Sequence, residues 1–175
     1  MKEFVLHQPL WDIAKALLGS NDVVYHFSNV TRKPARVGPN LSWHRDYPNR
    51  YICPAKACTF LRALIPLEGM YDANGCTEAL PQSHTITDEE AIQEEKNKAF
   101  DLRQIVSLNA EAGDVVIIHS KLLHGGRENR STRERNLVVI QLGVNTDTFL
   151  HWNAERFSGL TREAILEEQY SNACL

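Results

Sequence analysis

The spacing of hydrophobic residues changes along the chain, and the change predicts where helix gives way to strand. Between Phe4 and Leu18 apolar residues recur three or four positions apart, which is typical of a helix packed on a sheet, and Gly19 ends the pattern. Short apolar or alternating runs bounded by turn residues follow, and these are typical of strands. The predicted strands cover residues 22–30, 41–47, 59–67, 76–80, 102–108, 115–118 and 137–144.

Two more helices are predicted, at residues 88–98 and 161–169. Thr87 and Glu90 have the spacing of a capping box, which marks the start of the first of them. The charged residues of that helix are typical of a solvated face. Several short strands with turns between them predict a mainly β fold with flanking helices, either a sandwich or a barrel. No repeat, low-complexity segment or linker divides residues 1–175, so we expect a single domain.

Composition and charge exclude several classes of partner. The chain has 19 Lys and Arg against 22 Asp and Glu and no long basic run, so we expect no binding to nucleic acid. No apolar run approaches the roughly 18 residues of a membrane span. Polar residues also interrupt the N-terminal stretch that a signal peptide would need. The four cysteines lack Cys-x-x-Cys spacing and are expected to be reduced, so these features favour a cytoplasmic protein.

His44 and Asp46 are the first residues that suggest chemistry. In an extended strand residues i and i+2 project to the same side, so a strand over residues 41–47 aims one imidazole and one carboxylate at a common point. Together they make two thirds of the 2-His-1-carboxylate triad, which binds Fe(II) and leaves coordination positions open. The pair alone is a weak signal, because a strand-end histidine bonded to a neighbouring aspartate is the commoner arrangement.

The second half of the chain offers the missing ligand. His119 and His124 follow the apolar strand at residues 115–118, and either can complete the triad. Arg135 lies eleven residues past His124 and opens the next strand, with Arg133 on the same strand face. Arginine binds a carboxylate through two parallel hydrogen bonds, so an arginine here suits a dicarboxylate bound beside a metal.

Three stretches give a combined pattern that none gives alone. They are Trp43-His44-Arg45-Asp46, then Asn74 through Pro81-Gln82-Ser83-His84, and finally Gly113 through His124-Gly125-Gly126 to Arg135. In order and spacing, the combination resembles the phytanoyl-CoA dioxygenase family of Fe(II)- and 2-oxoglutarate-dependent oxygenases. The resemblance implies a double-stranded β-helix, a cupin-like jelly roll, and covers most of the chain.

The resemblance also implies a set of site residues. His44, Asp46 and His124 are the iron ligands, and Arg135 binds the far carboxylate of 2-oxoglutarate. His124 is selected over His119 because the family's distal histidine precedes the Gly-rich, Asn-x-Ser stretch. The cofactors are Fe(II), O2 and 2-oxoglutarate as cosubstrate. An aspartate at position 46 favours hydroxylation, because halogenating relatives carry a small residue there.

Two positions depart from the family pattern. Gln82 stands where the family usually has a glycine before Ser-His, which alters the turn. Gly126 stands where many members have a hydroxyl residue that supports the oxoglutarate carboxylate. Asn29 and Ser131 are the candidates to supply that support instead.

Arg62 is the first candidate to contact the substrate. Arg62 points inward if residues 59–65 follow the family alignment, and an inward arginine is costly unless it meets an anion. That anion is a structural carboxylate, the substrate or the second oxoglutarate carboxylate, unless the side chain faces outward. Trp43 and Tyr47 are candidates to line the substrate pocket. Weaker candidates for the rim are Arg50, Tyr51 and Trp152.

The expected function is a dioxygenase that hydroxylates an aliphatic C–H bond of a small metabolite and releases succinate and CO2. An anionic metabolite is favoured if Arg62 binds it. One alternative is a cupin-like metal enzyme that uses no 2-oxoglutarate. Such an enzyme would need more histidine ligands, and it would not explain the position of Arg135. The other is a non-catalytic jelly-roll binding domain, against which a complete triad with Arg135 argues.

Overall fold

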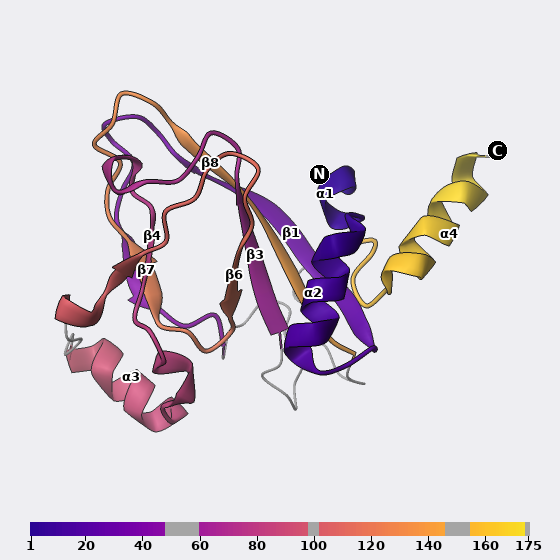
Figure 1. The fold of residues 1–175 in the computed structure, drawn as a ribbon, viewed down its shortest axis with the longest axis horizontal. Coiled ribbons are helices and arrows are strands. Elements are labelled where there is room, and N and C mark those ends of the chain that lie inside the picture. The colour runs from indigo at the N-terminus through magenta and orange to yellow at the C-terminus, as the bar shows by residue number, and fades with distance from the viewer. Residues whose placement is uncertain (48–59, 98–101, 146–154, 174–175) are drawn as a thin grey trace. The chain divides into compact units, whose positions relative to one another are not determined.

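The structure is a computed structural model, and it describes residues 1–47, 60–97, 102–145 and 155–173 (Figure 1). Its helices are α1 (Lys2–Val5), α2 (Gln8–Leu18), α3 (Asp88–Asn97) and α4 (Arg162–Ala173), with short 3-10 turns η1 (Asp72–Asn74), η2 (Ser83–Thr85) and η3 (Leu102–Gln104). Its strands are β1 (Val23–Lys33), β2 (Leu41–His44), β3 (Phe60–Pro66), β4 (Thr77–Ala79), β5 (Val106–Ser107), β6 (Val116–His119), β7 (His124–Gly126) and β8 (Arg135–Val144).

The strands form two four-stranded sheets, in the orders β1-β8-β3-β6 and β2-β7-β4-β5. In the second sheet β7 pairs antiparallel with both β2 and β4, and β4 pairs antiparallel with β5. Strands that are distant in sequence are therefore neighbours in space, as in folds built by crossing over between two sheets. The expectation of a mainly β fold with flanking helices is confirmed.

The chain separates into two compact units. The first comprises Met1–Asn29, Pro48–Arg62 and Ile140–Leu175, and the second comprises Val30–Tyr47 and Ala63–Val139. The core of the second unit is a cluster of buried residues on β3, β6, β8 and the turns between strands: Leu64, Met70, Cys76, Ala110, Ile118, Leu137 and Val139. The single domain expected from the sequence stays a prediction.

Several element boundaries differ from the predicted ones. The helix expected from Phe4 to Leu18 is two helices, because α2 begins at Gln8 with Pro9 in its first turn, where the missing amide hydrogen is harmless. Gly19 ends α2 with a left-handed conformation, as expected. Of the strand expected at residues 102–108, only β5 forms. The three-residue strand β7 was not predicted, because a His-Gly-Gly sequence has no strand propensity.

Other expectations on local structure hold. The capping box at the start of α3 is confirmed, since the Glu90 amide donates to Thr87 Oγ1 at 3.1 Å and the Thr87 amide donates to Glu90 Oε2 at 2.9 Å. Cys76 is a free, buried thiol.

No helix among the described residues is both long and apolar enough to cross a membrane. Some residues discussed above lie outside the described residues: Arg50, Tyr51, Cys53, Cys58, Trp152 and Cys174.

Candidate metal centre

His44 and His124 face each other across the antiparallel pair β2–β7. They are register partners, at the ends of the two strands, and their ring centroids are 4.3 Å apart. Directly opposed residues of an antiparallel pair project to the same face of the sheet. Strand pairing alone thus brings together two imidazoles that are far apart in the sequence.

Asp46 reaches the same point by a different route from the one predicted. β2 ends at His44, so strand periodicity does not place Asp46. Instead the amides of Asp46 and Tyr47 both donate to the carbonyl of Ser120 at 3.0 Å, which holds a bend after the strand. The carboxylate then lies between the imidazoles, with 3.8 Å from Oδ1 to His44 Nε2 and 3.8 Å from Oδ2 to His124 Nε2.

The three side chains form a compact donor set. Their ligand atoms lie within 4.8 Å of one another. The Nδ1 atoms of His44 and His124 lie 2.7 Å and 2.9 Å from the carbonyls of Ser42 and Leu122. An Nδ1–H bonded to a carbonyl leaves the Nε2 lone pair for a metal, which is the usual outer support of a histidine ligand. Two imidazoles and one carboxylate are the ligand set that suits Fe(II).

The Pro-x-Ser-His turn supports this centre through its serine. Ser83 Oγ accepts a hydrogen bond from the amide of Leu123 at 2.8 Å and donates to the carbonyl of Leu80 at 2.7 Å. Leu80 also donates its amide to the carbonyl of Leu123 at 3.0 Å. These bonds hold the residue next to His124. The supporting contacts of this turn belong to Ser83.

His119 lies apart from the donor set. Its Nδ1 accepts the amide of Lys121 at 3.0 Å, and its ring centroid is 5.3 Å from that of His84. Burial, with a smaller effect from His84, lowers the pKa of His119. Among the described residues the cluster with metal-ligand spacing contains His124 and not His119.

Arg45 is a structural residue that sequence reasoning missed. It lies between two of the candidate ligands and is only 8% exposed. Its Nη2 donates to the carbonyls of Ser83 at 2.6 Å and Ile86 at 3.2 Å, and its Nη1 pairs with Asp88 at 3.0 Å. Arg45 therefore ties the ligand-bearing bend to the start of α3. No pattern in the sequence distinguishes such a clamp from a surface arginine.

Arg135 is a buried cation at the start of β8. It is 4% exposed, and its Nη1 lies 3.9 Å from Met70 Sδ. Within the described part of the chain its Nε has no hydrogen-bond partner and no ion pair includes it. Burial lowers the pKa of Arg135 to about 10. Arg133, by contrast, is exposed, so the structure distinguishes two arginines that strand parity did not.

Lys33 is another buried cation, and its burial was not predicted from the sequence. It ends β1, is 7% exposed, and donates from Nζ to the carbonyl of Arg127. Burial, together with the charge of Arg135, lowers the pKa of Lys33 to about 8.

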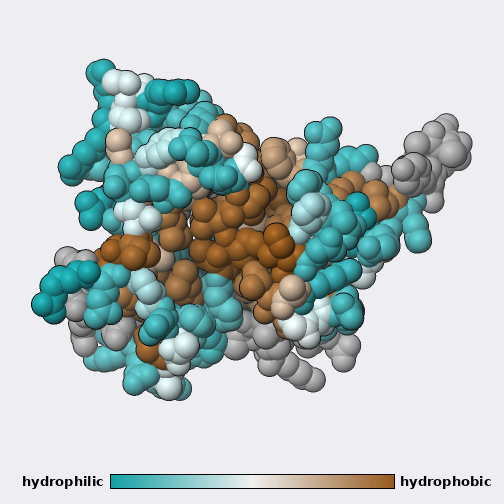
Figure 2. Space-filling model, in the orientation of Figure 1, coloured by the Kyte–Doolittle hydropathy of each residue, from teal (hydrophilic) through white to brown (hydrophobic). Residues whose placement is uncertain are grey.

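The β1–β2 and β7–β8 connections show a mostly hydrophilic surface on the face drawn in Figure 2, upper left. Lys33 and Arg135 are buried, whereas Arg127 and Arg130 have 74% and 81% exposed side chains.

The other candidates for cosubstrate support have different surroundings. Asn29 is exposed on β1. Ser131 Oγ donates within its own turn, to Asn129 Oδ1 at 2.8 Å and the carbonyl of Arg133 at 2.8 Å. Neither observation tests the predicted role, which stays a prediction.

The roles of Trp43, Tyr47 and Arg62 in substrate binding likewise stay predictions. Trp43 alternates to the sheet face opposite His44, where a Cβ atom built on Gly125 would lie 3.3 Å from Trp43 Cδ2. The Tyr47 ring lies 5.8 Å from Lys121 Nζ. Arg62 belongs to the first unit, where its Nε donates to Gln141 Oε1 at 3.2 Å and its guanidinium lies 5.4 Å from the Phe27 ring.

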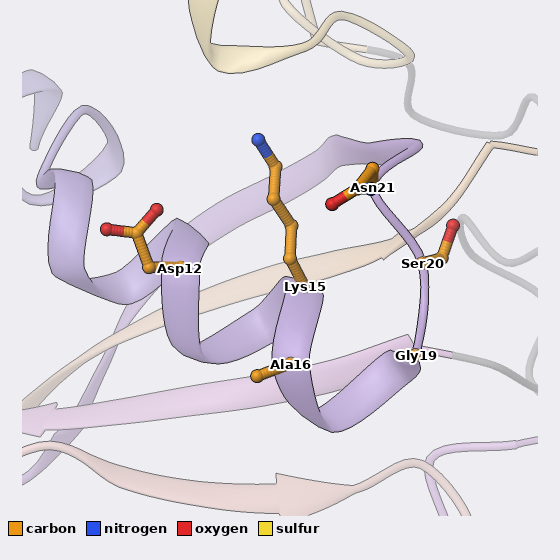
Figure 3. A pocket seen from close by; sticks show the side chains of 6 residues that line it. All are labelled: Asp12, Lys15, Ala16, Gly19, Ser20 and Asn21. Atoms are coloured by element: carbon orange, nitrogen blue, oxygen red, sulfur yellow. The ribbon is translucent and has the colours of Figure 1, made fainter.

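A pocket in the first unit has no such chemistry. It is lined by Asp12, Lys15, Ala16, Gly19, Ser20 and Asn21, at the end of α2. Figure 3 shows the Asp12 carboxylate pointing to one side, away from the Lys15 and Ser20 side chains, which both point to the top of the view.

Two four-stranded sheets, with two histidines and a carboxylate gathered beside one of them, define the class of jelly-roll proteins with an open 2-His-1-carboxylate centre. The model of the family described as "Phytanoyl-CoA dioxygenase (PhyH)" matches residues 1–137. The chain belongs to the phytanoyl-CoA dioxygenase family, as the sequence motifs predicted.

The chain is similar to several named proteins. Phytanoyl-CoA dioxygenase 1 from Oryza sativa subsp. japonica is 30% identical over 148 residues, covering 80% of this chain and 50% of that protein. L-proline trans-4-hydroxylase from Streptomyces griseoviridis is 26% identical over 164 residues, covering 79% and 61%. The chain spans about half the length of the first curated relatives it matches.

A solved structure shares the fold. EctD from S. alaskensis with bound Fe has a TM-score of 0.71 and 22% sequence identity, and the match covers 91% of this chain and 59% of that one. The expected double-stranded β-helix, or jelly-roll, fold is confirmed.

Proposed function

We propose that this chain is an Fe(II)- and 2-oxoglutarate-dependent dioxygenase that hydroxylates an aliphatic C–H bond of a small molecule. The observation that carries the proposal is the convergence of His44, Asp46 and His124 in a member of the phytanoyl-CoA dioxygenase family. With iron and 2-oxoglutarate bound, O2 and the oxoacid are converted to succinate and CO2 as the substrate gains a hydroxyl group.

The residues fit this task. The bend at Asp46 and the β2–β7 register hold the three donors before a metal arrives, so little ordering is needed on binding. Asp46 and His124 are 2% and 6% exposed, whereas the His44 side chain is 35% exposed. Buried donors exclude water on one side, and the partly exposed histidine marks the side from which small molecules enter.

Arg135 supports the choice of cosubstrate. A buried guanidinium is costly unless it meets an anion, and the described residues place no carboxylate against it. The far carboxylate of 2-oxoglutarate supplies that anion. A cupin-like enzyme without 2-oxoglutarate, or a non-catalytic binding domain, would not bring this carboxylate to the Arg135 guanidinium.

For the substrate we retain a small molecule, with Tyr47 as a candidate contact. Trp43, on the sheet face opposite His44, and Arg62, in the first unit, stay predictions from the sequence. Two relatives support the size class: one is named for hydroxylating L-proline, and EctD has been solved with 2-oxoglutarate and 5-hydroxyectoine. We also retain a cytoplasmic location with no nucleic-acid or membrane partner.

The test is a titration of the full chain with Fe(II) under anaerobic conditions. We expect one Fe(II) per chain, a visible absorption band when 2-oxoglutarate is added, and O2 uptake that depends on 2-oxoglutarate. His124→Ala should abolish all three, and His119→Ala is the matched control that should keep them. Iron binding without the band would favour the cupin-like alternative, and no iron binding would favour the binding domain.

A further inference from the structure

Gly126 shows which side of the second sheet Lys33 occupies. Residues 124 and 126 lie on one strand, so a side chain at position 126 would project to the same face as the His124 imidazole. A Cβ atom built on Gly126 would lie 3.3 Å from Lys33 Nζ. The Lys33 ammonium is therefore on the sheet face that carries the candidate metal ligands.

Position 126 has no room for a side chain of its own. The same Cβ atom would lie 2.7 Å from the carbonyl oxygen of Cys76, closer than folded proteins allow. The glycine that departs from the family pattern is thus required by its surroundings. Lys33 fills the space with a charged group that comes from another strand.

The end of β1 holds Lys33 in this place. Asn129 Nδ2 donates to the carbonyl of Lys33 at 3.0 Å and to that of Arg133 at 2.8 Å. Asn129 is fully buried, and its own amide donates to the carbonyl of Gly38 at 2.9 Å. One side chain therefore fixes the end of β1 against the residues that lead into β8 and Arg135.

The charges around Lys33 leave its positive charge in excess. Glu78 is buried nearby, but its Oε1 pairs with Arg127 Nε at 2.8 Å. Burial raises the pKa of the Cys76 thiol to about 11, so it is neutral at pH 7. Arg135 adds a second positive charge that acts on Lys33. Two buried cations on one side of a core call for an anion, since burial of unpaired charge is costly.

We infer that Lys33 and Arg135 together bind the far carboxylate of 2-oxoglutarate, with the Lys33 ammonium in the space where a side chain at position 126 would lie. This inference rests on the proposed function and adds a binding residue to it. Two cations on one carboxylate also select a dicarboxylic oxoacid against a monocarboxylic one, because only the former brings a charge to both ends.

The test measures binding without turnover, by calorimetry on the full chain loaded with Mn(II). The ligands are 2-oxoglutarate and 2-oxopentanoate, which has the same carbon chain without the far carboxylate. The variants are Lys33→Met and Lys33→Gln, since glutamine keeps a donor for the Arg127 carbonyl. Lys15→Met on α2 is the control for the loss of one positive charge.

We expect both Lys33 variants to bind 2-oxoglutarate about tenfold to a hundredfold more weakly, and 2-oxopentanoate as the wild type does. Mn(II) stoichiometry and all binding by Lys15→Met should be unchanged. Lys33 variants that bind 2-oxoglutarate within about twofold of the wild type, or lose both oxoacids equally, would overturn the inference alone. A wild type that binds metal but no 2-oxoglutarate would overturn the proposed function as well.

Discussion

His44 and His124 occupy one register position of the β2–β7 pair, yet their side chains are 35% and 6% exposed. The two candidate ligands are thus chemically alike and sterically different. The candidate metal centre is therefore buried at His124 and partly exposed at His44.

The difference predicts how each histidine reacts with an acylating reagent. Diethyl pyrocarbonate should modify His44 in the metal-free chain much faster than His124, because the reagent must reach an imidazole nitrogen. Mn(II) should protect His44 and leave the exposed His7 reactive as an internal control. Peptide mass spectrometry gives the rates, and equal modification of His44 with and without Mn(II) would contradict its role as a ligand.

Arg135→Met should stabilise the metal-free chain and abolish its binding of 2-oxoglutarate. Methionine removes a buried charge that no described carboxylate neutralises, so the free energy of unfolding should rise by about 1–3 kcal/mol. Stabilisation by 2-oxoglutarate should disappear, whereas a wild type at a hundred times its Kd gains about 2.7 kcal/mol. Urea unfolding with and without ligand measures both effects. Arg133→Met is the matched exposed control, and a destabilised Arg135→Met would show that the guanidinium is structural.

The lowered pKa of Lys33 predicts a pH dependence of stability. The folded pKa is about 8 and the ordinary value is 10.5, so between these values the unfolded chain binds more protons than the folded one. The contribution of Lys33 to the free energy of unfolding therefore rises with pH through this window. Lys33→Met should be more stable than the wild type at pH 7, and that advantage should shrink towards pH 10. The groups that act on Lys33 (Arg135, Cys76 and Glu78) are present in both proteins, so urea unfolding of the pair isolates its titration. A constant difference across this range would contradict the shift.

Gln82 predicts a stabilising substitution. It has a φ of 65°, in the left-handed region where a Cβ atom is unfavourable, and glycine is the usual residue of the family there. Gln82→Gly should raise the free energy of unfolding by up to about 1 kcal/mol. Gln82→Val should lower it, because a β-branched side chain tolerates this conformation least. Thermal unfolding measures the stability of both variants. A Gln82→Val variant more stable than Gln82→Gly would show that the turn is not strained.

The candidate metal ligands could be predicted from the sequence because each one lies in a short motif of its own. His44 and Asp46 are two residues apart, and His124 precedes a glycine-rich stretch of the family pattern. The backbone bend that positions Asp46 could not be predicted from the sequence, since it depends on hydrogen bonds to the distant carbonyl of Ser120. The strand β7 was missed for a related reason: its pairing with β2 and β4, and not its own propensity, makes it a strand.

Lys33 shows a different limit of the sequence. The strand was expected to end at residue 30, and a lysine beyond a strand end is ordinarily solvated. Its burial follows from the glycine at position 126 and from the approach of Gly38, whose Cβ atom would lie 2.9 Å from Lys33 Cβ. Close backbone approaches between distant segments leave no periodic trace in a sequence. Arg45 was missed because its partners, Ser83, Ile86 and Asp88, are distant from it in the sequence.

A substitution at Asn129 is expected to change which oxoacid the chain binds. Its side-chain amide spans the carbonyls of Lys33 and Arg133, so it sets how far apart the two strand ends that carry the cations stand. A substitution there alters the gap without touching either charge. If Lys33 and Arg135 bind the far carboxylate as we infer, we expect variants that accept a longer or shorter oxoacid to be found at Asn129.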